Sequence, residues 1–232
     1  MRLLLEERRK RLERGERAIG WKVGFGTPAA LESLGTRRAL VGFLTDGSLL
    51  DRGARVSLAG WRNPMLEPEV AVHIAEDVDP AGGREALEAA VDGLGAAIEL
   101  ADVAPPPEDP ERILAGNIYQ RHVMLGPVDR GRRQTAGVTA RVVKNDEEVA
   151  ASREPATLTG EPLDVLELVV ETLASFGERL RAGEVVITGS VVAPLAVAAG
   201  DVVRVELPPL GWLAVSFDEG GQADRTTTEG SP

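Results

Sequence analysis

The chain has 232 residues, 43% of them apolar and 27% charged, and this composition excludes collagen, coiled-coil rods and largely disordered chains. The net charge of −11 repels the phosphate backbone of nucleic acids, which we therefore do not expect as partners. The absence of cysteine and the presence of only two histidines exclude disulfides and sulfur-ligated metals, so a metal site would have to be built from oxygen.

The first quarter of the chain predicts a polar helix followed by strands. Residues 2–17 contain good helix formers and neither proline nor glycine before Gly15, so we expect an N-terminal helix there. A strand is expected at Ile19–Phe25. A short helix is expected at Pro28–Leu34, because proline opens it and glycine follows its end. Short strands separated by turns rich in aspartate and glycine are expected at Val41–Leu44, Leu49–Leu50 and Arg55–Leu58.

The next strand is expected at Glu67–Ala75, where two kinds of side chain alternate. Glu67 and Glu69 fall on one face, and β-branched residues fall on the other. Pro68 lies between the two glutamates and removes a backbone donor, which favours a strand start or a sheet edge.

The rest of the chain adds helices and strands without regular βαβ alternation. The strongest helix signal is Pro162–Leu180, whose apolar residues recur every three or four positions on a face suited to packing against a sheet. Two further helices and a turn are expected at Arg84–Asp92, Pro110–Ala115 and Pro105–Pro107. Strands and one hairpin tip are expected at Gly95–Val103, Gln120–Gly126, Val138–Val143, Lys144–Glu147 (the tip), Val185–Thr188, Val202–Leu207 and Trp212–Phe217.

These elements predict an α+β fold built round a mixed or antiparallel sheet. Residues 1–217 would form one domain that starts with the helix at 1–17, and residues 218–232 would be a disordered tail. The longest uncharged stretch, Val185–Gly200, has sixteen residues, fewer than the roughly 20 that span a bilayer. The N-terminus lacks the apolar core of a signal peptide. We therefore expect no membrane partner and a cytoplasmic location.

Three glutamates give the strongest chemical signal. Glu67 and Glu69 would lie about 6.6 Å apart along one strand face, and Glu99 interrupts an otherwise apolar strand. Buried carboxylates imply a cation, a proton or a base as partner, and oxygen-only ligation favours Mg²⁺ or Mn²⁺ over Zn²⁺. A solvent-facing strand with an edge glutamate explains the same spacing, so both alternatives stay open. His73, roughly 20 Å along the strand from Glu67, cannot share the site.

Two other segments have chemical potential but allow ordinary explanations. Lys22 is one of three lysines and lies between two glycines among apolar residues. It could balance the carboxylates or bind an anion, or simply extend its ammonium to solvent. Thr188 to Ser190 offers hydroxyl and N–H groups for a carboxylate, or forms a plain turn. The loop after Gly24 lacks the third glycine of a dinucleotide-binding motif, and no Gly-x-Ser-x-Gly elbow exists.

Four segments in order match a known pattern. They are GWKVG around Lys22, LEPEV with Glu67 and Glu69, AIELAD with Glu99 and Asp102, and LRAGEVVITGS ending at Ser190. Together they resemble the 2-keto-4-pentenoate hydratase branch of the fumarylacetoacetate hydrolase superfamily, over roughly residues 19–217. The resemblance implies a mixed β-roll or sandwich with peripheral helices, assembled as a dimer or larger ring.

The resemblance also implies roles for individual residues. Glu67, Glu69 and Glu99 would hold Mg²⁺ or Mn²⁺, and Lys22 and Glu69 would act in catalysis. The metal would bind the carboxylate and 2-oxo oxygens of a 2-oxo acid and stabilise its enolate as a Lewis acid, while Lys22 supports the negative charge.

Four more residues would contact this substrate. Thr188 and Ser190 would bind its carboxylate, and Asn117 or Gln120 would face its reacting end.

The implied activity is that of a divalent-metal-dependent lyase acting on a small 2-oxo acid or its enol, with hydration of 2-hydroxypenta-2,4-dienoate as the first candidate. The chain departs from the family hydratases at Leu40, where an acidic residue is usual, and at Tyr119-Gln120, where two serines are usual. Decarboxylation of a 2-oxo-3-enedioate is therefore the alternative, and C–C hydrolysis of an acylpyruvate comes third. The non-enzymatic alternative is an idle, metal-stabilised binding or assembly protein.

Overall fold

The computed structural model describes residues 1–103 and 109–220. The turn expected at Pro105–Pro107 and most of the expected tail lie outside the described residues. None of the helices in these two ranges is long and apolar enough to cross a membrane.

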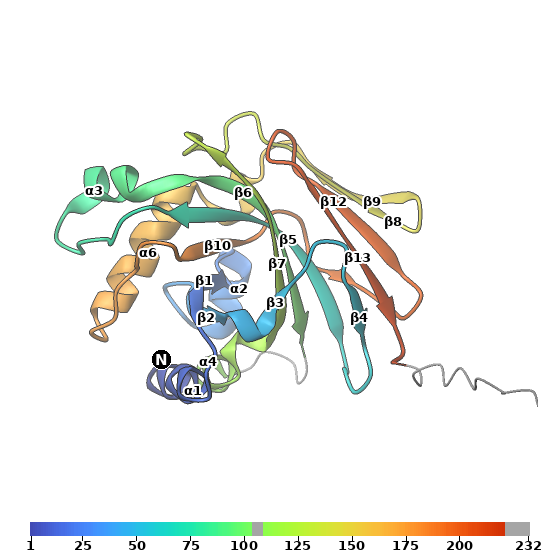
Figure 1. Cartoon of the computed structure of the whole chain (residues 1–232), viewed down its shortest axis with the longest axis horizontal. Coiled ribbons are helices and arrows are strands. Elements are labelled where there is room, and N and C mark those ends of the chain that lie inside the picture. Colours follow the sequence, from blue (N-terminus) through green and yellow to red (C-terminus); the bar gives the residue numbers. More distant parts are fainter. Residues whose placement is uncertain (104–108, 221–232) are drawn as a thin grey trace, which may run out of the picture.

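Two β-sheets form the body of the molecule (Figure 1). The larger sheet has the order β2-β1-β10-β5-β6-β7-β3, with β11 paired to β5, and the smaller has the order β4-β13-β12-β8-β9. The strands of the larger sheet are β1 (Ala18–Gly24), β2 (Leu40–Thr45), β3 (Leu49–Leu50), β5 (Pro64–Ile74), β6 (Val91–Asp102), β7 (Gln120–Arg130), β10 (Val185–Ser190) and β11 (Leu195–Ala196). Those of the smaller sheet are β4 (Arg55–Ser57), β8 (Ala140–Lys144), β9 (Glu147–Ser152), β12 (Val202–Glu206) and β13 (Trp212–Asp218).

Helices lie on the outside of these sheets (Figure 1). They are α1 (Arg2–Glu13), α2 (Pro28–Leu34), α3 (Gly83–Ala90), α4 (Pro110–Ala115), α5 (Ala156–Thr159) and α6 (Pro162–Ala174), with short 3-10 turns η1 (Asp46–Ser48) and η2 (Asn117–Tyr119). Both sheets contain parallel as well as antiparallel pairs. The prediction of an α+β fold with mixed sheets and peripheral helices is confirmed.

Alternate residues of β5 and β6 face two different environments. Val70 and Ile98 belong to the main apolar core, which also contains residues of α6 and of the smaller sheet. Glu67, Glu69 and Glu99 have the opposite parity and share their face with a much smaller apolar cluster. The period of two therefore separates the residues that stabilise the fold from those available for chemistry.

Pro68 does not mark a strand start or a sheet edge, as the sequence had indicated. It lies inside β5, which is paired on both sides. The strand β10 ends at Ser190, opposite Glu69, and β11 resumes the pairing opposite Leu66, so Pro68 lies in the gap between these two ladders. A proline is tolerated in this gap, because its missing N–H removes no ladder hydrogen bond to β10 or β11.

Several element boundaries differ from the expectations. The helix α6 ends at Ala174 instead of Leu180, because the chain turns at Gly177 with a φ of 76°, although Leu180 remains buried in the core. The strand β6 begins at Val91, several residues early, because it pairs with β5 along almost its whole length. The short elements β9, β11, α5 and η2 were not predicted.

Candidate active site

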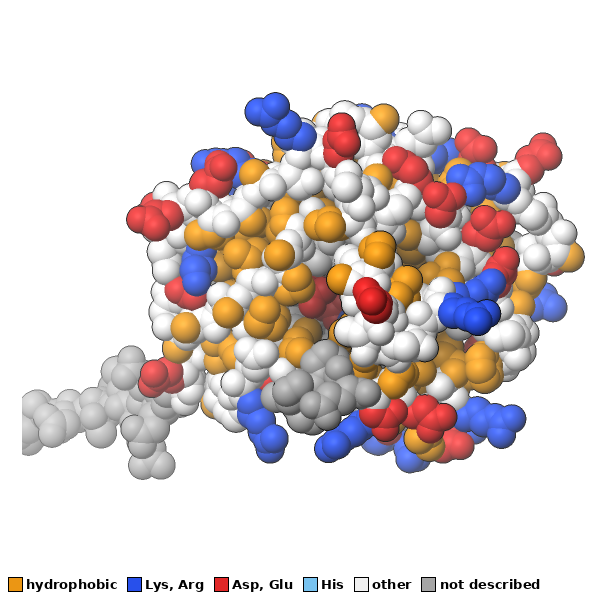
Figure 2. Space-filling model, turned by 180° about the vertical axis from the view of Figure 1, so that it is seen from behind, with side chains coloured by type: hydrophobic (Ala, Val, Ile, Leu, Met, Phe, Trp, Pro, Cys, Tyr) orange, Lys and Arg blue, Asp and Glu red, His pale blue; other side chains and the backbone are white. Residues whose placement is uncertain are grey.

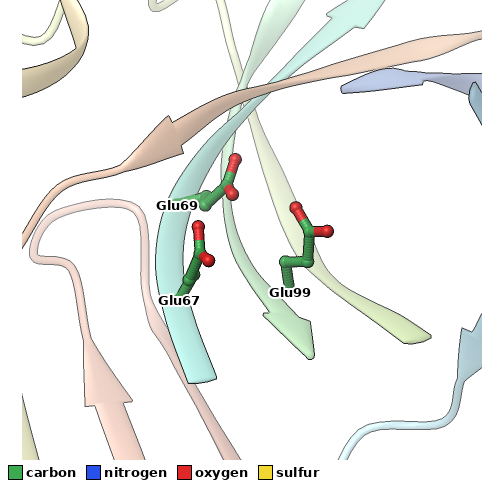
Figure 3. A group of neighbouring side chains, drawn as sticks. All are labelled: Glu67, Glu69 and Glu99. Carbon is green, nitrogen blue, oxygen red and sulfur yellow. The ribbon is translucent and has the colours of Figure 1, made fainter. Parts of the chain in front are cut away.

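Three glutamates from two neighbouring strands point toward one another (Figure 3). Glu67 and Glu69 follow one face of β5, and Glu99 of β6 is the direct cross-strand partner of Glu67. One carboxylate oxygen from each lies within 4.8 Å of the other two. Glu69 and Glu99 are fully buried, and Glu67 borders a cavity. The alternative that these glutamates lie on a solvent-facing strand is therefore wrong.

Burial raises the pKa of all three carboxyl groups. The pKa of Glu67 rises to about 7 because of burial and the negative charge of Glu99, against the opposing effect of Lys22. Burial and the charges of Glu99 and Glu67 raise the pKa of Glu69 well above its usual value. Burial also raises the pKa of Glu99, and the ammonium group of Lys22 opposes this rise. A cluster of this kind favours protons or a bound cation.

The donor set fits a divalent cation. When ionised, the three carboxylates outweigh the one neighbouring ammonium by two charges, which one divalent cation would neutralise. Glu69 Oε1 and Glu99 Oε2 are buried without a hydrogen-bond partner in the described part of the chain, so both oxygens are available as ligands. Carboxylate ligands completed by water suit Mg²⁺ or Mn²⁺.

Lys22 extends from β1 to the same cluster. Its side chain is 3% exposed and forms a buried ion pair with Glu99 Oε1, and Nζ donates a second hydrogen bond to the carbonyl oxygen of Ile118 at 3.3 Å. The alternation of β1 directs Trp21 and Val23 into the main core and Lys22 to the other face. Because an ammonium group has three N–H donors, these two acceptors leave one donor for the cavity that Lys22 also lines.

The turn η2 has an unusual backbone. Asn117, Ile118 and Tyr119 have φ values of 51°, 53° and 62°, in a region that costs about 1–2 kcal/mol per L-residue and that isoleucine rarely adopts. The Asn117 amide bridges to Phe43 of β2. Its Oδ1 accepts from the Phe43 N–H and its Nδ2 donates to the Phe43 carbonyl, both at 2.9 Å.

We expected Asn117 or Gln120 to face the reacting end of a substrate, but neither side chain is among those that line the cavity. The oxygen and the nitrogen of the Asn117 side-chain amide are both hydrogen-bonded to the backbone of Phe43. The side chain of Gln120 is buried and accepts a long hydrogen bond from Asn117 at 3.4 Å. A substrate contact by either residue stays a prediction, and the contacts of Asn117 favour a role in holding the backbone.

The segment at the end of β10 closes another side of the cluster. Thr188 Oγ1 donates to the carbonyl oxygen of Val70 at 3.2 Å, and the Gly189 N–H donates to Glu69 Oε2 at 2.7 Å. Ser190 Oγ is buried without a hydrogen-bond partner within the two described ranges and lines the cavity. Thr188 and Ser190 were both predicted to bind a carboxylate, and of these two only the Ser190 hydroxyl has its hydrogen available to donate.

A cavity of about 720 Å³ borders the cluster at Glu67 and Lys22. Acidic side chains lie at the bottom of a hollow that hydrophobic side chains surround (Figure 2). The cavity is also lined by residues to which sequence reasoning gave no binding role: Phe25, Arg37, Asn63, Met65, Tyr119 and Leu168. They come from several different elements, so no local motif could have identified them.

Three residues noted from the sequence lie outside the glutamate cluster. His73 is not among the grouped ligands. Leu40 packs in a small apolar cluster with Ile113. Asp102 accepts hydrogen bonds from the backbone N–H groups of Arg62 and Asn63 at 3.0 and 2.8 Å, so it holds the loop before β5.

Comparison with known proteins agrees with this architecture. Residues 26–217 match the profile described as fumarylacetoacetate (FAA) hydrolase C-terminal. A 4-oxalocrotonate decarboxylase of Pseudomonas sp is 27% identical, with 89% of this chain and 81% of the relative aligned. A 2-hydroxyhexa-2,4-dienoate hydratase of Comamonas testosteroni is 28% identical, with 88% of this chain and 80% of the relative aligned.

A solved structure has the same fold along most of its length. The 4-oxalocrotonate decarboxylase from Pseudomonas putida G7, complexed with magnesium and adipate, superposes with a TM-score of 0.85 at 25% identity. The superposition covers 92% of this chain and 83% of that one. Because the profile match covers residues 26–217, which include all three glutamates and reach every strand except β1, the chain belongs to the fumarylacetoacetate hydrolase family.

Proposed function

We propose that the chain is a divalent-metal-dependent lyase acting on a small 2-oxo acid or its enol, with hydration of 2-hydroxypenta-2,4-dienoate as the first candidate reaction. The observation that carries this proposal is the convergence of three carboxylates, two of them fully buried, with one buried ammonium group, beside a largely apolar cavity that Glu67 and Lys22 line. Relatives named 2-keto-4-pentenoate hydratase and 2-hydroxyhexa-2,4-dienoate hydratase support it.

Glu67, Glu69 and Glu99 would hold the cation, for which Mg²⁺ and Mn²⁺ fit the all-oxygen donor set best. When bound, the ion supplies Lewis-acid stabilisation of negative charge on the 2-oxo oxygen. The magnesium in the complex of the Pseudomonas putida G7 decarboxylase supports a hard divalent cation.

Two residues of the chain would act on the substrate directly. The ammonium group of Lys22, held by Glu99 and Ile118, would stabilise negative charge that develops on the substrate, an effect that is large where water is excluded. The free hydroxyl of Ser190 would donate to the substrate carboxylate. In the hydration one water is consumed: the enol proton moves to C5, the hydroxyl group adds to C4, and a proton from water ends on C3.

Decarboxylation of a 2-oxo-3-enedioate is the second candidate. It releases CO₂ and needs no side chain that activates water. Leu40 occupies an apolar cluster where family hydratases usually carry an acid, and this favours decarboxylation. Arg37 lines the cavity and could attract a second carboxylate. Relatives named 4-oxalocrotonate decarboxylase support the same alternative.

The experiment offers the purified protein with Mg²⁺ three substrates: a 2-hydroxydienoate, a 2-oxo-3-enedioate and an acylpyruvate. Loss of dienol absorbance without CO₂ identifies hydration, CO₂ release identifies decarboxylation, and two carboxylic acids from the acylpyruvate identify C–C hydrolysis. Thermal stabilisation by Mg²⁺ without turnover of any substrate would contradict the lyase proposal and favour an idle, metal-stabilised binding protein.

Two variants separate metal binding from charge stabilisation. Glu69→Gln should lower kcat at least about 100-fold and abolish the rise in Tm on adding Mg²⁺, because it removes a ligand. Lys22→Met should lower kcat about 100-fold but keep the Mg²⁺-dependent rise in Tm. Glu147→Gln, on the exposed strand β9, is the matched control and should behave like the wild type. Retained Mg²⁺ affinity in Glu69→Gln would count against the metal site.

Assembly as a homo-oligomer and a cytoplasmic location stay predictions. Val202 and Trp212 of β12 and β13 are large apolar residues that are 54% and 56% exposed, and each could pack against a second subunit. Light scattering coupled to gel filtration would give the mass in solution.

A further inference from the structure

The amide of Asn117 performs a task that the proposed chemistry does not yet account for. Its oxygen and nitrogen both bind the backbone of Phe43, as a paired strand would, although Asn117 lies in a turn and not in a strand. The three residues of this turn have left-handed backbones. Without an external hold, an isoleucine at a positive φ would relax toward a commoner conformation.

The left-handed turn presents the carbonyl oxygen of Ile118 to Lys22. That oxygen accepts from Nζ at 3.3 Å while Glu99 Oε1 takes another of its hydrogens. A carbonyl oxygen at a different φ and ψ would point elsewhere, so the direction of the ammonium group depends on the conformation of the turn. Asn117 is the side chain that fixes this conformation against β2.

Gly42 makes the arrangement sterically possible. A Cβ atom at this position would lie 2.8 Å from Asn117 Oδ1 and 2.8 Å from Lys22 Cγ, closer than real Cβ contacts allow. Lys22 and Gly42 are cross-strand partners in the β1–β2 pair. The side chains of Asn117 and Lys22 therefore share the space that the missing Cβ of Gly42 leaves free.

We propose that Asn117 is a positioning residue for Lys22: through the Phe43 backbone and the Ile118 carbonyl, it aims the third N–H of the ammonium group into the cavity. It acts through another residue instead of touching the substrate. This inference rests on the proposed function, because it assigns a task to the amine that would stabilise the substrate's negative charge.

Asn117→Gly is the decisive substitution, because glycine keeps the left-handed backbone accessible and removes the amide with its bridge to Phe43 and its long hydrogen bond to Gln120. We expect kcat to fall about 10- to 100-fold, the effect of a misplacement of about 1 Å, with KM changed less than about threefold. The Mg²⁺-dependent rise in Tm should stay, because the three glutamates keep their contacts.

Asn145→Gly is the matched control. Asn145 also has a positive φ, of 52°, and its amide also makes two hydrogen bonds, to Asp201 Oδ1 at 2.7 Å and from the Val202 N–H at 2.9 Å. It lies in the β8–β9 hairpin of the smaller sheet. The same loss of an amide there should leave kcat unchanged. An equal loss of kcat in both variants would overturn the proposal.

A spectroscopic readout tests the inference without any substrate. The chain has three lysines, and Lys22 alone has a buried, hydrogen-bonded ammonium group among them. In protein labelled with ¹⁵N-lysine, this group should give a slowly exchanging ¹H–¹⁵N signal. The signal should shift or broaden in Asn117→Gly and stay in Asn145→Gly. An unchanged signal in Asn117→Gly would overturn the inference, whatever reaction the protein catalyses.

The kinetic outcomes separate this inference from its competitors. A raised KM with unchanged kcat would overturn it in favour of direct substrate contact by Asn117. Loss of the Mg²⁺ response would overturn it in favour of an effect on the carboxylates. If Asn117→Gly does not fold, Gly42→Ala displaces the same pair from the other side, and wild-type kcat in that variant would contradict the proposal.

Discussion

At the scale of single residues, the site depends on charges placed where apolar side chains would stabilise the fold better. Glu69 and Glu99 are fully buried. Desolvation of each ionised carboxylate costs several kcal/mol, which a partner must offset. Lys22 offsets part of it through Glu99. The backbone strain of η2 also lowers stability, since the left-handed conformation of Ile118 orients a carbonyl group instead of stabilising the fold.

His73 provides a prediction about pH at this scale. Burial lowers the pKa of its imidazole, with a smaller opposing effect of Asp92, so the folded protein binds the proton less readily than the unfolded chain does. The contribution of His73 to the free energy of unfolding is therefore fully present above the pKa of its imidazole in the unfolded chain, about 6.5. This contribution is lost as the pH falls, by at most about 1.4 kcal/mol per pH unit.

His73→Gln should remove this dependence. Urea unfolding of both proteins at about pH 7.5 and about pH 5.5 checks it, because the difference between wild type and variant cancels the other titrating groups. The wild type should lose more stability on acidification than the variant. Equal losses in the two proteins would show that His73 takes up its proton equally in both states.

At the scale of elements, strands place the chemistry and helices cover the sheets. The strands β1, β5 and β6 each direct one parity into the main core and the other toward the cluster. The helix α2 follows local signals: Thr27 Oγ1 accepts from the Ala30 N–H at 3.3 Å, Pro28 opens the helix, and Gly35 ends it at a φ of 60°. Such an element is readable from the sequence, because its signals lie within a few residues of one another.

The helix α6 supplies the prediction at this scale. Leu166 is fully buried in the main core, so Leu166→Ala should lower the free energy of unfolding by about 2–5 kcal/mol. Leu3→Ala in α1 is the control, because Leu3 is 56% exposed and its truncation should cost no more than about 0.5 kcal/mol. Chemical denaturation at neutral pH measures both. Similar costs for the two changes would mean that α6 is not anchored through this face.

At the scale of the whole molecule, one main apolar core joins the two sheets. It contains residues of β5 and β6 together with Val203 and Val215 of the smaller sheet. The cavity forms on the larger sheet, where residues from both halves of the chain meet. The shape of the site therefore depends on the assembled fold and not on any one segment.

We propose that residues 1–217 form a single domain, and a shared core predicts one cooperative unfolding transition. Circular dichroism reports on both sheets, and a variant with Trp61→Phe and Trp212→Phe keeps Trp21 of the larger sheet as its only tryptophan, whose fluorescence can be excited selectively. The two signals from this variant should give the same denaturation midpoint. Two distinct midpoints would show that the sheets unfold as separate units.

The sequence by itself determined the repeating patterns. The alternation in β5, the limits of α2, the apolar face of α6 and the presence of three glutamates in apolar strands all follow from interactions between residues close in the chain. The position of Pro68 and the end of α6 were missed, because the gap between β10 and β11 and a turn at Gly177 decide them. Neither leaves a periodic signal.

Only the tertiary structure decided which groups meet. Lys22 and Glu99 are 77 residues apart, and Asn117 and Phe43 are 74 apart; neither pair is encoded in a local spacing. The sequence marked Asn117 as a polar residue near a substrate, and the fold turned its amide to the backbone of β2. The physical reason is that hydrogen bonds between distant segments depend on sheet order and register, which the long-range packing of the core determines.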